Sequence, residues 1–227
     1  ACKRLAVYGS DVCIPEVAKL LNDPELASWA RITLEAIPGE TASQSLRSAA
    51  ERLEGLLLVG VINSIGVRGD EAAIDLLSEK LNQGTLEVAE AAALALGRIG
   101  TIAAAQALHG FLTNAPPALQ SVTSEACILC AEQMRLAGNT NTALRIFDSL
   151  RAMDLPEQRI VEATRGAILA RGDGGIELLR EQLRSENRKL LAVGLQTARE
   201  ITSDQLGPAL IDEIGSARPD RASLIVE

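Results

Sequence analysis

The segment "EVAEAAALALGRIGT", residues 87–101, decides the fold. Its Ala and Leu residues are strong helix formers, and a glycine at its end can adopt the left-handed conformation that terminates a helix. A related segment, "LLLVGVINSIGVRGD", lies 31 residues earlier at 56–70, and its last two glycines align with Gly97 and Gly100. The pair predicts a helical unit that repeats along the chain.

Weaker copies of this segment extend the repeat in both directions, at residues 27–40, 158–173 and 189–204. The units end 30 to 38 residues apart, at Gly9, Gly39, Gly69, Gly100, Gly138, Gly172 and about Ser203. A residue of a type that caps helices follows each end. The expected caps are Ser10, Thr41, Asp70, Thr101, Asn139, Asp173 and Asp204.

Each unit also has an internal break, as in "NDPEL", where Asp23 can cap a helix and Pro24 suits its first turn. One unit is therefore a hairpin of two antiparallel helices. A single hairpin cannot bury its apolar face, whereas a stack of hairpins can. We predict an all-α protein in which residues 1–227 form one domain, a right-handed α-solenoid of about six to seven hairpins.

With these features, residues 86–101 closely resemble a HEAT repeat of the short bacterial type, also called the phycobilisome-lyase-like HEAT repeat. The resemblance rests on the valine, the stacked alanines and the closing L-G-x-I-G. It is good at 56–70 and traceable over nearly the whole chain. The resemblance implies a scaffold for protein–protein contact, and the order of the units is also similar to HEAT modules of large, often exported bacterial proteins.

The central part departs from this pattern. Residues 131–153 resemble a tetratricopeptide-type turn and helix, with Gly138, Ala143 and Phe147 in the expected places. The unit at about 101–155 is also the longest. We therefore expect a local change in the curvature of the solenoid there.

The charge balance restricts the partners. The chain has 22 Lys and Arg against 30 Asp and Glu, a net charge of −8. Because nucleic-acid binders depend on basic residues at phosphates, we expect no nucleic-acid partner. No apolar run reaches the length of a membrane span, so we expect no membrane insertion. The chain starts without Met or a signal-peptide core, and we expect it to be part of a longer protein of unknown location.

The pair Cys127 and Cys130 has the C-x-x-C spacing of redox and zinc sites. A redox motif places its first thiol at a helix N-terminus, whereas a helix starting near residues 116–117 puts Cys127 about ten residues in. We predict that both thiols pack in the core, on one face with Thr123 and Met134. A disulfide between Cys2 and Cys13 is an open alternative to two free thiols there.

Catalysis and cofactor binding find little support in the residues. His109 is the single histidine, no G-x-S-x-G occurs, and "GDGG" at 172–175 lacks the lysine and spacing of a phosphate-binding loop. A zinc site using the Cys pair and His109 has no obvious fourth ligand. We expect no metal, no cofactor and no enzymatic activity.

The remaining candidates are binding residues. Second helices usually line the concave surface of such solenoids, and equivalent positions there form an acidic ladder with an apolar patch: Glu25 and Ser28, Leu56 and Val59, Glu87 and Glu90, Glu125 and Ile128, Arg159 and Glu162. Trp29, beside Ser28 and Arg31, is a second candidate anchor. Asn63 and Ser64 need hydrogen-bond partners if buried, and we expect them to tie neighbouring units together.

The sequence thus predicts a non-catalytic protein-interaction module, monomeric as this chain, whose partner carries a basic or amphipathic segment. Two alternatives stay open. A structural spacer between catalytic or cofactor domains would have a uniformly polar groove. A ligand-binding or enzymatic HEAT protein would have a closed pocket around His109 or Trp29.

Overall fold

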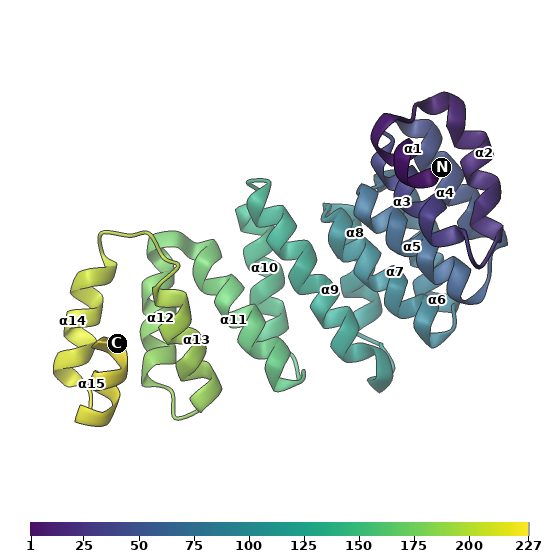
Figure 1. Ribbon diagram of the computed structural model, residues 1–227. Helices are drawn as coiled ribbons and strands as arrows, with labels where there is room; N and C mark the ends of the chain where they lie inside the picture. The colour runs from purple at the N-terminus through teal and green to yellow at the C-terminus, as the bar shows by residue number, and fades with distance from the viewer. Residues whose placement is uncertain (227) are drawn as a thin grey trace. The chain divides into compact units, whose positions relative to one another are not determined.

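The computed structural model describes residues 1–226, which form fifteen α-helices and no β-strand. Consecutive helices are antiparallel and form hairpins (Figure 1). The all-α solenoid fold predicted from the repeat is confirmed. The chain divides into two compact units, Ala1–Gln133 and Met134–Glu227. Two expectations stay predictions: that the chain is one continuous domain, and that the curvature of the solenoid changes within the long central repeat at about 101–155.

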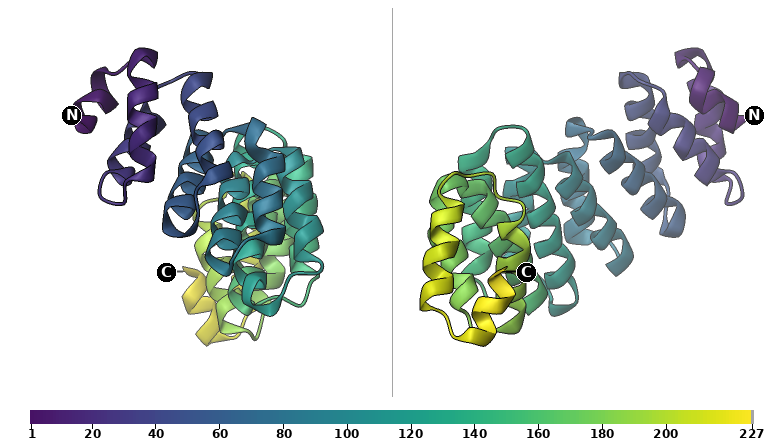
Figure 2. Two further views of the ribbon diagram at one scale, coloured as in Figure 1. Left: turned by 90° about the vertical axis from the view of Figure 1, so that its right-hand side faces the viewer. Right: turned by 60° about the vertical axis from the view of Figure 1, so that its left-hand side comes forward.

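The first unit is a two-layered stack of hairpins. The second helices α3, α5 and α7 lie side by side in one layer, and α1 packs on α3 in the place of a further second helix (Figure 2). The first helices contact one another in pairs, α2 with α4 and α6 with α8. The helix bounds are α1 Cys2–Tyr8, α2 Ile14–Lys19, α3 Ala27–Ala36, α4 Glu40–Arg52, α5 Gly55–Arg68, α6 Ile74–Gln83, α7 Leu86–Ile99, α8 Ile102–Leu112 and α9 Pro117–Leu136.

The second unit repeats the same arrangement. Its hairpins are α10 with α11, α12 with α13, and α14 with α15. Neighbouring hairpins contact one another through α11 and α13 and through α12 and α14. The helix bounds are α10 Thr140–Arg151, α11 Glu157–Arg171, α12 Ile176–Arg184, α13 Arg188–Ala198, α14 Leu206–Ser216 and α15 Pro219–Val226.

Glycine sets the spacing of the second helices in the first unit. A Cβ atom on Gly66 of α5 would lie 2.7 Å from the Cα of Ala95 in α7. A Cβ atom on Gly97 would lie 2.7 Å from the carbonyl oxygen of Ala126 in α9. The same glycine-to-alanine contact therefore occurs twice, 31 residues apart, and the sequence period is the period of the packing.

Arginine and serine side chains tie the same helices together. The guanidinium of Arg68 on α5 donates to carbonyl oxygens at the end of α3 and in the turn after it, at Leu34 (2.5 Å), Glu35 (3.3 Å), Ile37 (2.7 Å) and Gly39 (2.8 Å). Ser64 donates to Glu35 Oε1 at 2.6 Å. Arg98 Nη1 donates to Asn63 Oδ1 at 3.4 Å. The prediction that Asn63 and Ser64 connect neighbouring units is confirmed.

The extra length of the central repeat, at about 101–155, comes from one helix. Helix α9 has 20 residues, whereas α5 and α7 have 14 each. Ala126 is the tenth residue of α9, as Ala95 is of α7, so the additional turns lie beyond the packing contact. In the following hairpin Ala143 and Phe147 are buried, and a Cβ atom on Gly166 would lie 2.3 Å from the Phe147 ring.

The predicted helix ends are correct in part. Gly69 and Gly100 adopt the left-handed conformation just after α5 and α7, whereas Gly9 is extended. Thr101 caps α8 by accepting a hydrogen bond from the amide of Ala104, and Asp23 accepts from the amides of residues 25 and 26. The other predicted caps are wrong, because no capping hydrogen bond is made by Ser10, Thr41, Asp70, Asn139, Asp173 or Asp204 at the described helix starts.

Asp70 shows why. A 3₁₀ turn, Glu71–Ala73, separates it from α6, and its carboxylate turns to Arg47 on α4, whose Nη1 lies 2.7 and 2.5 Å from the two carboxylate oxygens. Asp70, which was predicted to cap a helix, therefore links two hairpins through its ion pair with Arg47.

The glycine contact can be tested by adding one methyl group. Alanine favours helix over glycine by about 0.5–1 kcal/mol, so Gly110→Ala, at a helical position with open space, should stabilise the protein by that amount. Gly66→Ala and Gly97→Ala should instead lower the free energy of unfolding by about 1–3 kcal/mol, because the methyl group meets backbone. Urea unfolding measures all three. Equal effects at the three positions would contradict the proposed packing.

Arg68 should contribute more to the stability of the fold than its partly exposed position suggests. Hydrogen bonds to a charged group each contribute about 1.5–3 kcal/mol and are not additive. We expect Arg68→Ala to lower the free energy of unfolding by about 2 kcal/mol or more. Arg52→Ala is the control, because exposed Arg52 makes one hydrogen bond within its own helix. Similar losses from the two variants in thermal unfolding would show that the carbonyl contacts contribute little.

Candidate functional site

The exposed side of α3, α5 and α7, together with the start of α9, is called here the second-helix face. The packing contacts fix its register, since Glu35, Gly66 and Gly97 occupy equivalent positions. Equivalent residues of successive repeats, including Glu25 in the turn before α3, then form rows across the face. The rows are Glu25, Leu56 and Glu87; Ser28, Val59, Glu90 and Ser121; and Ile32, Asn63, Leu94 and Glu125.

One position of the predicted ladder is displaced. Glu125 is the ninth residue of α9, as Leu94 is of α7, whereas Glu87 is the second residue of its helix. Glu125 therefore lies two turns beyond the row of Glu87, and the predicted alignment of Glu125 with Glu87 is wrong. The displacement arises because the extra residues of α9 lie at its C-terminal end, between Glu125 and Gly138.

The first unit carries most of the net negative charge of the chain. Residues 1–133 contain 9 Lys and Arg against 16 Asp and Glu, whereas residues 134–227 contain 13 against 14. Glu87 is exposed at the start of α7, and its carboxylate accepts hydrogen bonds from its own backbone amide and from Thr85, which lower its pKa. The second-helix face therefore presents a firmly ionised acid within an acidic unit.

Apolar side chains interrupt this acidic surface. Leu56 is 85% exposed, Val59 and Leu94 are half-buried, and Ile32 and Val67 are exposed. The prediction named Leu56 and Val59 but missed Ile32 and Val67. The spacing from Ser28 to Ile32 is one helical turn and could have revealed Ile32, because residues four apart share a face.

Trp29 and Arg31 lie apart from this surface. Trp29 is 44% exposed and lines an apolar hollow of about 330 Å³ with Cys2, Leu20 and Leu26, on the side of α3 that faces α1. Arg31 Nη1 donates to the carbonyl oxygen of Gly60 at 3.0 Å and to Ser64 Oγ at 3.4 Å. Arg31 thus joins α3 to α5, while its neighbour Ser28 is exposed on the second-helix face.

Two predicted ladder residues belong to the second unit. Arg159 and Glu162 lie on α11, and Arg159 Nη1 is 2.5 Å from Glu162 Oε2. The two side chains therefore form an ion pair within one helix, and both are half-buried. Their role in partner binding stays a prediction.

The C-x-x-C pair is part of the core, as predicted. Cys127 and Cys130 are buried in the middle of α9, together with Thr123 and Met134. Burial raises the pKa of both thiols to about 12. Cys2 and Cys13 are half-buried and free, and the Cys13 thiol donates to the carbonyl oxygen of Ser10 at 3.0 Å. The reactive thiolate needed for redox chemistry is therefore disfavoured at the C-x-x-C pair.

Other chemistry-bearing groups are dispersed. His109 is exposed on α8. Across residues 1–226, His, Cys, Asp and Glu side chains form no cluster of three or more that could hold a metal ion. No helix in this range is both long enough and apolar enough to cross a membrane.

Comparison with known proteins agrees with this architecture. Residues 88–114 match the family model of the PBS lyase HEAT-like repeat. Residues 88–114 are thus a HEAT-like repeat within an all-α solenoid, and the resemblance noted at residues 86–101 is confirmed. No curated protein sequence matches the chain.

Two solved structures share the fold. The complex of CpcE and CpcF of phycocyanin lyase from Nostoc sp. PCC7120 is 21% identical, with a TM-score of 0.52 over 92% of this chain and 90% of that one. Human deoxyhypusine hydroxylase in complex with glycerol is 16% identical, with a TM-score of 0.51 over 95% of this chain and 94% of that one. At these identities the likeness establishes the fold alone.

The burial of the C-x-x-C pair predicts selective thiol reactivity. At about pH 8 an aromatic disulfide reagent should modify Cys2 and Cys13 in the native protein, while Cys127 and Cys130 react only after unfolding in guanidinium, because thiolates are the nucleophiles. Absorbance of the released thiol, with mass spectrometry of the labelled peptides, measures this. Rapid modification of Cys127 in the folded protein would contradict the core assignment.

Proposed function

We propose that the protein is a non-catalytic binding scaffold whose second-helix face holds a basic, amphipathic segment of a partner protein. The observation that carries this proposal is that apolar and acidic side chains, exposed or half-buried, stand in the same rows. Leu56 lies between Glu25 and Glu87, and Val59 lies between Ser28 and Glu90.

The charge of the first unit supports a basic partner. With 16 acidic and 9 basic residues, the unit attracts cationic segments and repels acidic ones. Charge complementarity of this kind mainly raises the association rate and excludes wrong partners. The apolar residues would then supply the affinity, because buried aliphatic and aromatic anchors contribute most of the energy of an interface.

The exposed leucine favours a binding role over a spacer. A spacer needs only a solvated outer face, whereas Leu56 is 85% exposed in the middle of the stack. Its equivalents in the neighbouring repeats, Glu25 in the turn before α3 and Glu87 on α7, are polar, so the repeat does not require an apolar residue there. The structure of CpcE in complex with CpcF also supports the proposal, since a protein of this fold assembles there with another chain.

The proposal is tested with a synthetic amphipathic helix that carries Lys on one face and Leu on the other. Binding to the full chain is followed by fluorescence anisotropy. Reversing Glu87 and Glu90 to Arg should weaken binding about tenfold at low salt and less at high salt, because the added positive charges repel the peptide. Leu56→Ala should weaken it by a similar factor that depends little on salt.

A matched charge reversal is the control. Glu71→Arg with Asp75→Arg changes the net charge of the first unit equally, but these exposed residues belong to the first-helix layer at the start of α6. This variant should bind the peptide nearly as well as the wild type. Equal weakening by the two reversals would show that only net charge matters, and would overturn the assignment of the face.

A further inference from the structure

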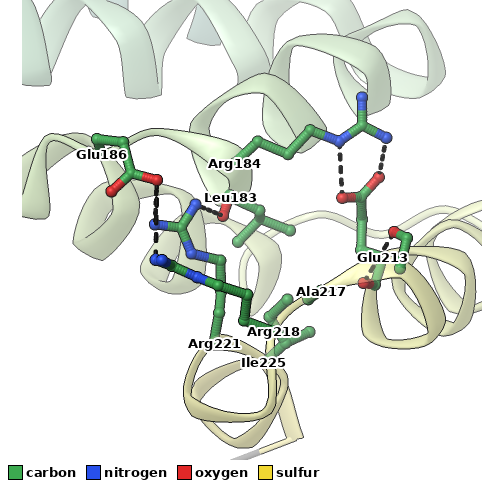
Figure 3. A pocket seen from close by; sticks show the side chains of 9 residues that line it. Leu183, Arg184, Glu186, Glu213, Ala217, Arg218, Arg221 and Ile225 are labelled. Atoms are coloured by element: carbon green, nitrogen blue, oxygen red, sulfur yellow. Dashed lines mark hydrogen bonds and ion pairs between the residues drawn. The ribbon is translucent and has the colours of Figure 1, made fainter.

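The second unit contains a separate hollow of about 390 Å³ (Figure 3). It lies where the C-terminal ends of α12 and α14 meet α15. Its walls combine three arginines, two glutamates and a few small or apolar side chains. The lining residues are Leu183, Arg184, Glu186, Glu213, Ser216, Ala217, Arg218, Arg221 and Ile225.

One of the two carboxylates is fully engaged. Glu213 has only 3% of its side chain exposed, and it accepts hydrogen bonds from Arg180 Nε at 2.5 Å and from Arg184 Nε at 2.9 Å. Burial alone would raise the pKa of Glu213, but the hydrogen bonds from the two arginines lower it overall. Glu213 therefore holds α14 against α12 and fixes Arg184 at the edge of the hollow.

The other two arginines are held loosely. Arg221 Nη2 lies 3.5 Å and Arg218 Nη2 lies 3.8 Å from the same oxygen of Glu186, and both guanidiniums point toward this carboxylate (Figure 3). Charge-assisted hydrogen bonds between such groups are normally about 2.7–2.9 Å long. Glu186 itself is 83% exposed, so water competes for its oxygens. A single exposed carboxylate thus faces two positive charges.

The remaining contacts leave these guanidiniums with spare donors. Arg221 donates to the carbonyl oxygen of Leu183 at 3.3 Å, and Arg218 approaches Asp220 at 3.9 Å. Each guanidinium has five N–H donors in a planar fork that matches carboxylate and phosphate oxygens. Arg218 and Arg221 could therefore both bind one ligand with several oxygens and more than one negative charge.

We propose that this hollow binds a small phosphate monoester, with its phosphate group between Arg218 and Arg221. A phosphate dianion has twice the charge of Glu186 and three terminal oxygens, so it can accept hydrogen bonds from both arginines at normal length. The hollow extends past the arginines to Ala217 and Ile225, which offer an apolar wall to the organic part of the ester. This site is independent of the second-helix face, which belongs to the first unit.

The test uses the full chain and phenyl phosphate, titrated at constant ionic strength and followed by isothermal calorimetry. Arg218→Ala should weaken binding about tenfold or more, because one charged pair is lost. Arg218 is 67% exposed, so its removal should leave the fold intact. Arg188→Ala is the matched control, because this exposed arginine of α13 lies outside the hollow, and it should bind phenyl phosphate as the wild type does.

Glu186→Gln separates a binding site from a purely structural cluster. If Glu186 competes with the ligand, the neutral amide should tighten phenyl phosphate binding several-fold and leave thermal stability nearly unchanged. Inorganic phosphate serves as the second arm: weaker binding than phenyl phosphate indicates an ester, and equal binding indicates free phosphate. No heat of binding, or equal affinities of the Arg218→Ala and Arg188→Ala variants, would overturn the proposal.

Discussion

The close approach of second helices at glycine is the constraint on which the first unit depends. Gly66 and Gly97 leave no room for a side chain, because the backbone of the next helix lies where a Cβ atom would be. This short distance places the side chains of α5, α7 and the start of α9 in common rows. Between α3 and α5, where Glu35 takes the position of this glycine, hydrogen bonds replace the contact: Ser64 donates to Glu35 and Arg68 donates to the end of α3. The binding face proposed here is thus a product of backbone packing.

The two units use their charged residues differently. In the first, 16 acidic residues stand against 9 basic ones, so carboxylates are in excess. In the second, the two signs are nearly equal in number, and ion pairs join different elements, such as Arg171 with Asp148 on α10 and Arg165 with Glu200 in the turn after α13. A basic segment and a phosphate monoester are therefore compatible ligands for one acidic chain, because each site has its own local charge.

The fold could be predicted from residues 87–101 because helix propensity, terminating glycine and period all agree there. The binding face could be predicted in part, since Leu56, Glu87 and Glu90 follow from the repeat alone. The position of Glu125 in the rows could not be predicted, because no local sequence signal shows how far α9 continues beyond its packing contact. The role of Asp70 was equally hidden, since its partner Arg47 lies 23 residues away. The arginine hollow depends on side chains from three helices.

The repeated glycine contact also restricts how the chain can change in length. An α-helix turns by about 100° per residue, so one residue inserted into α7 before Gly97 would rotate that glycine away from Ala126. An insertion in a turn, or beyond the contact as in α9, leaves the helical phase intact. The series of glycine contacts between second helices ends at α9, because Ile128 occupies there the position that Gly66 and Gly97 have in α5 and α7. A gene for such a stack can therefore gain or lose whole hairpins, or lengthen at helix ends, far more readily than it can shift by single residues within them.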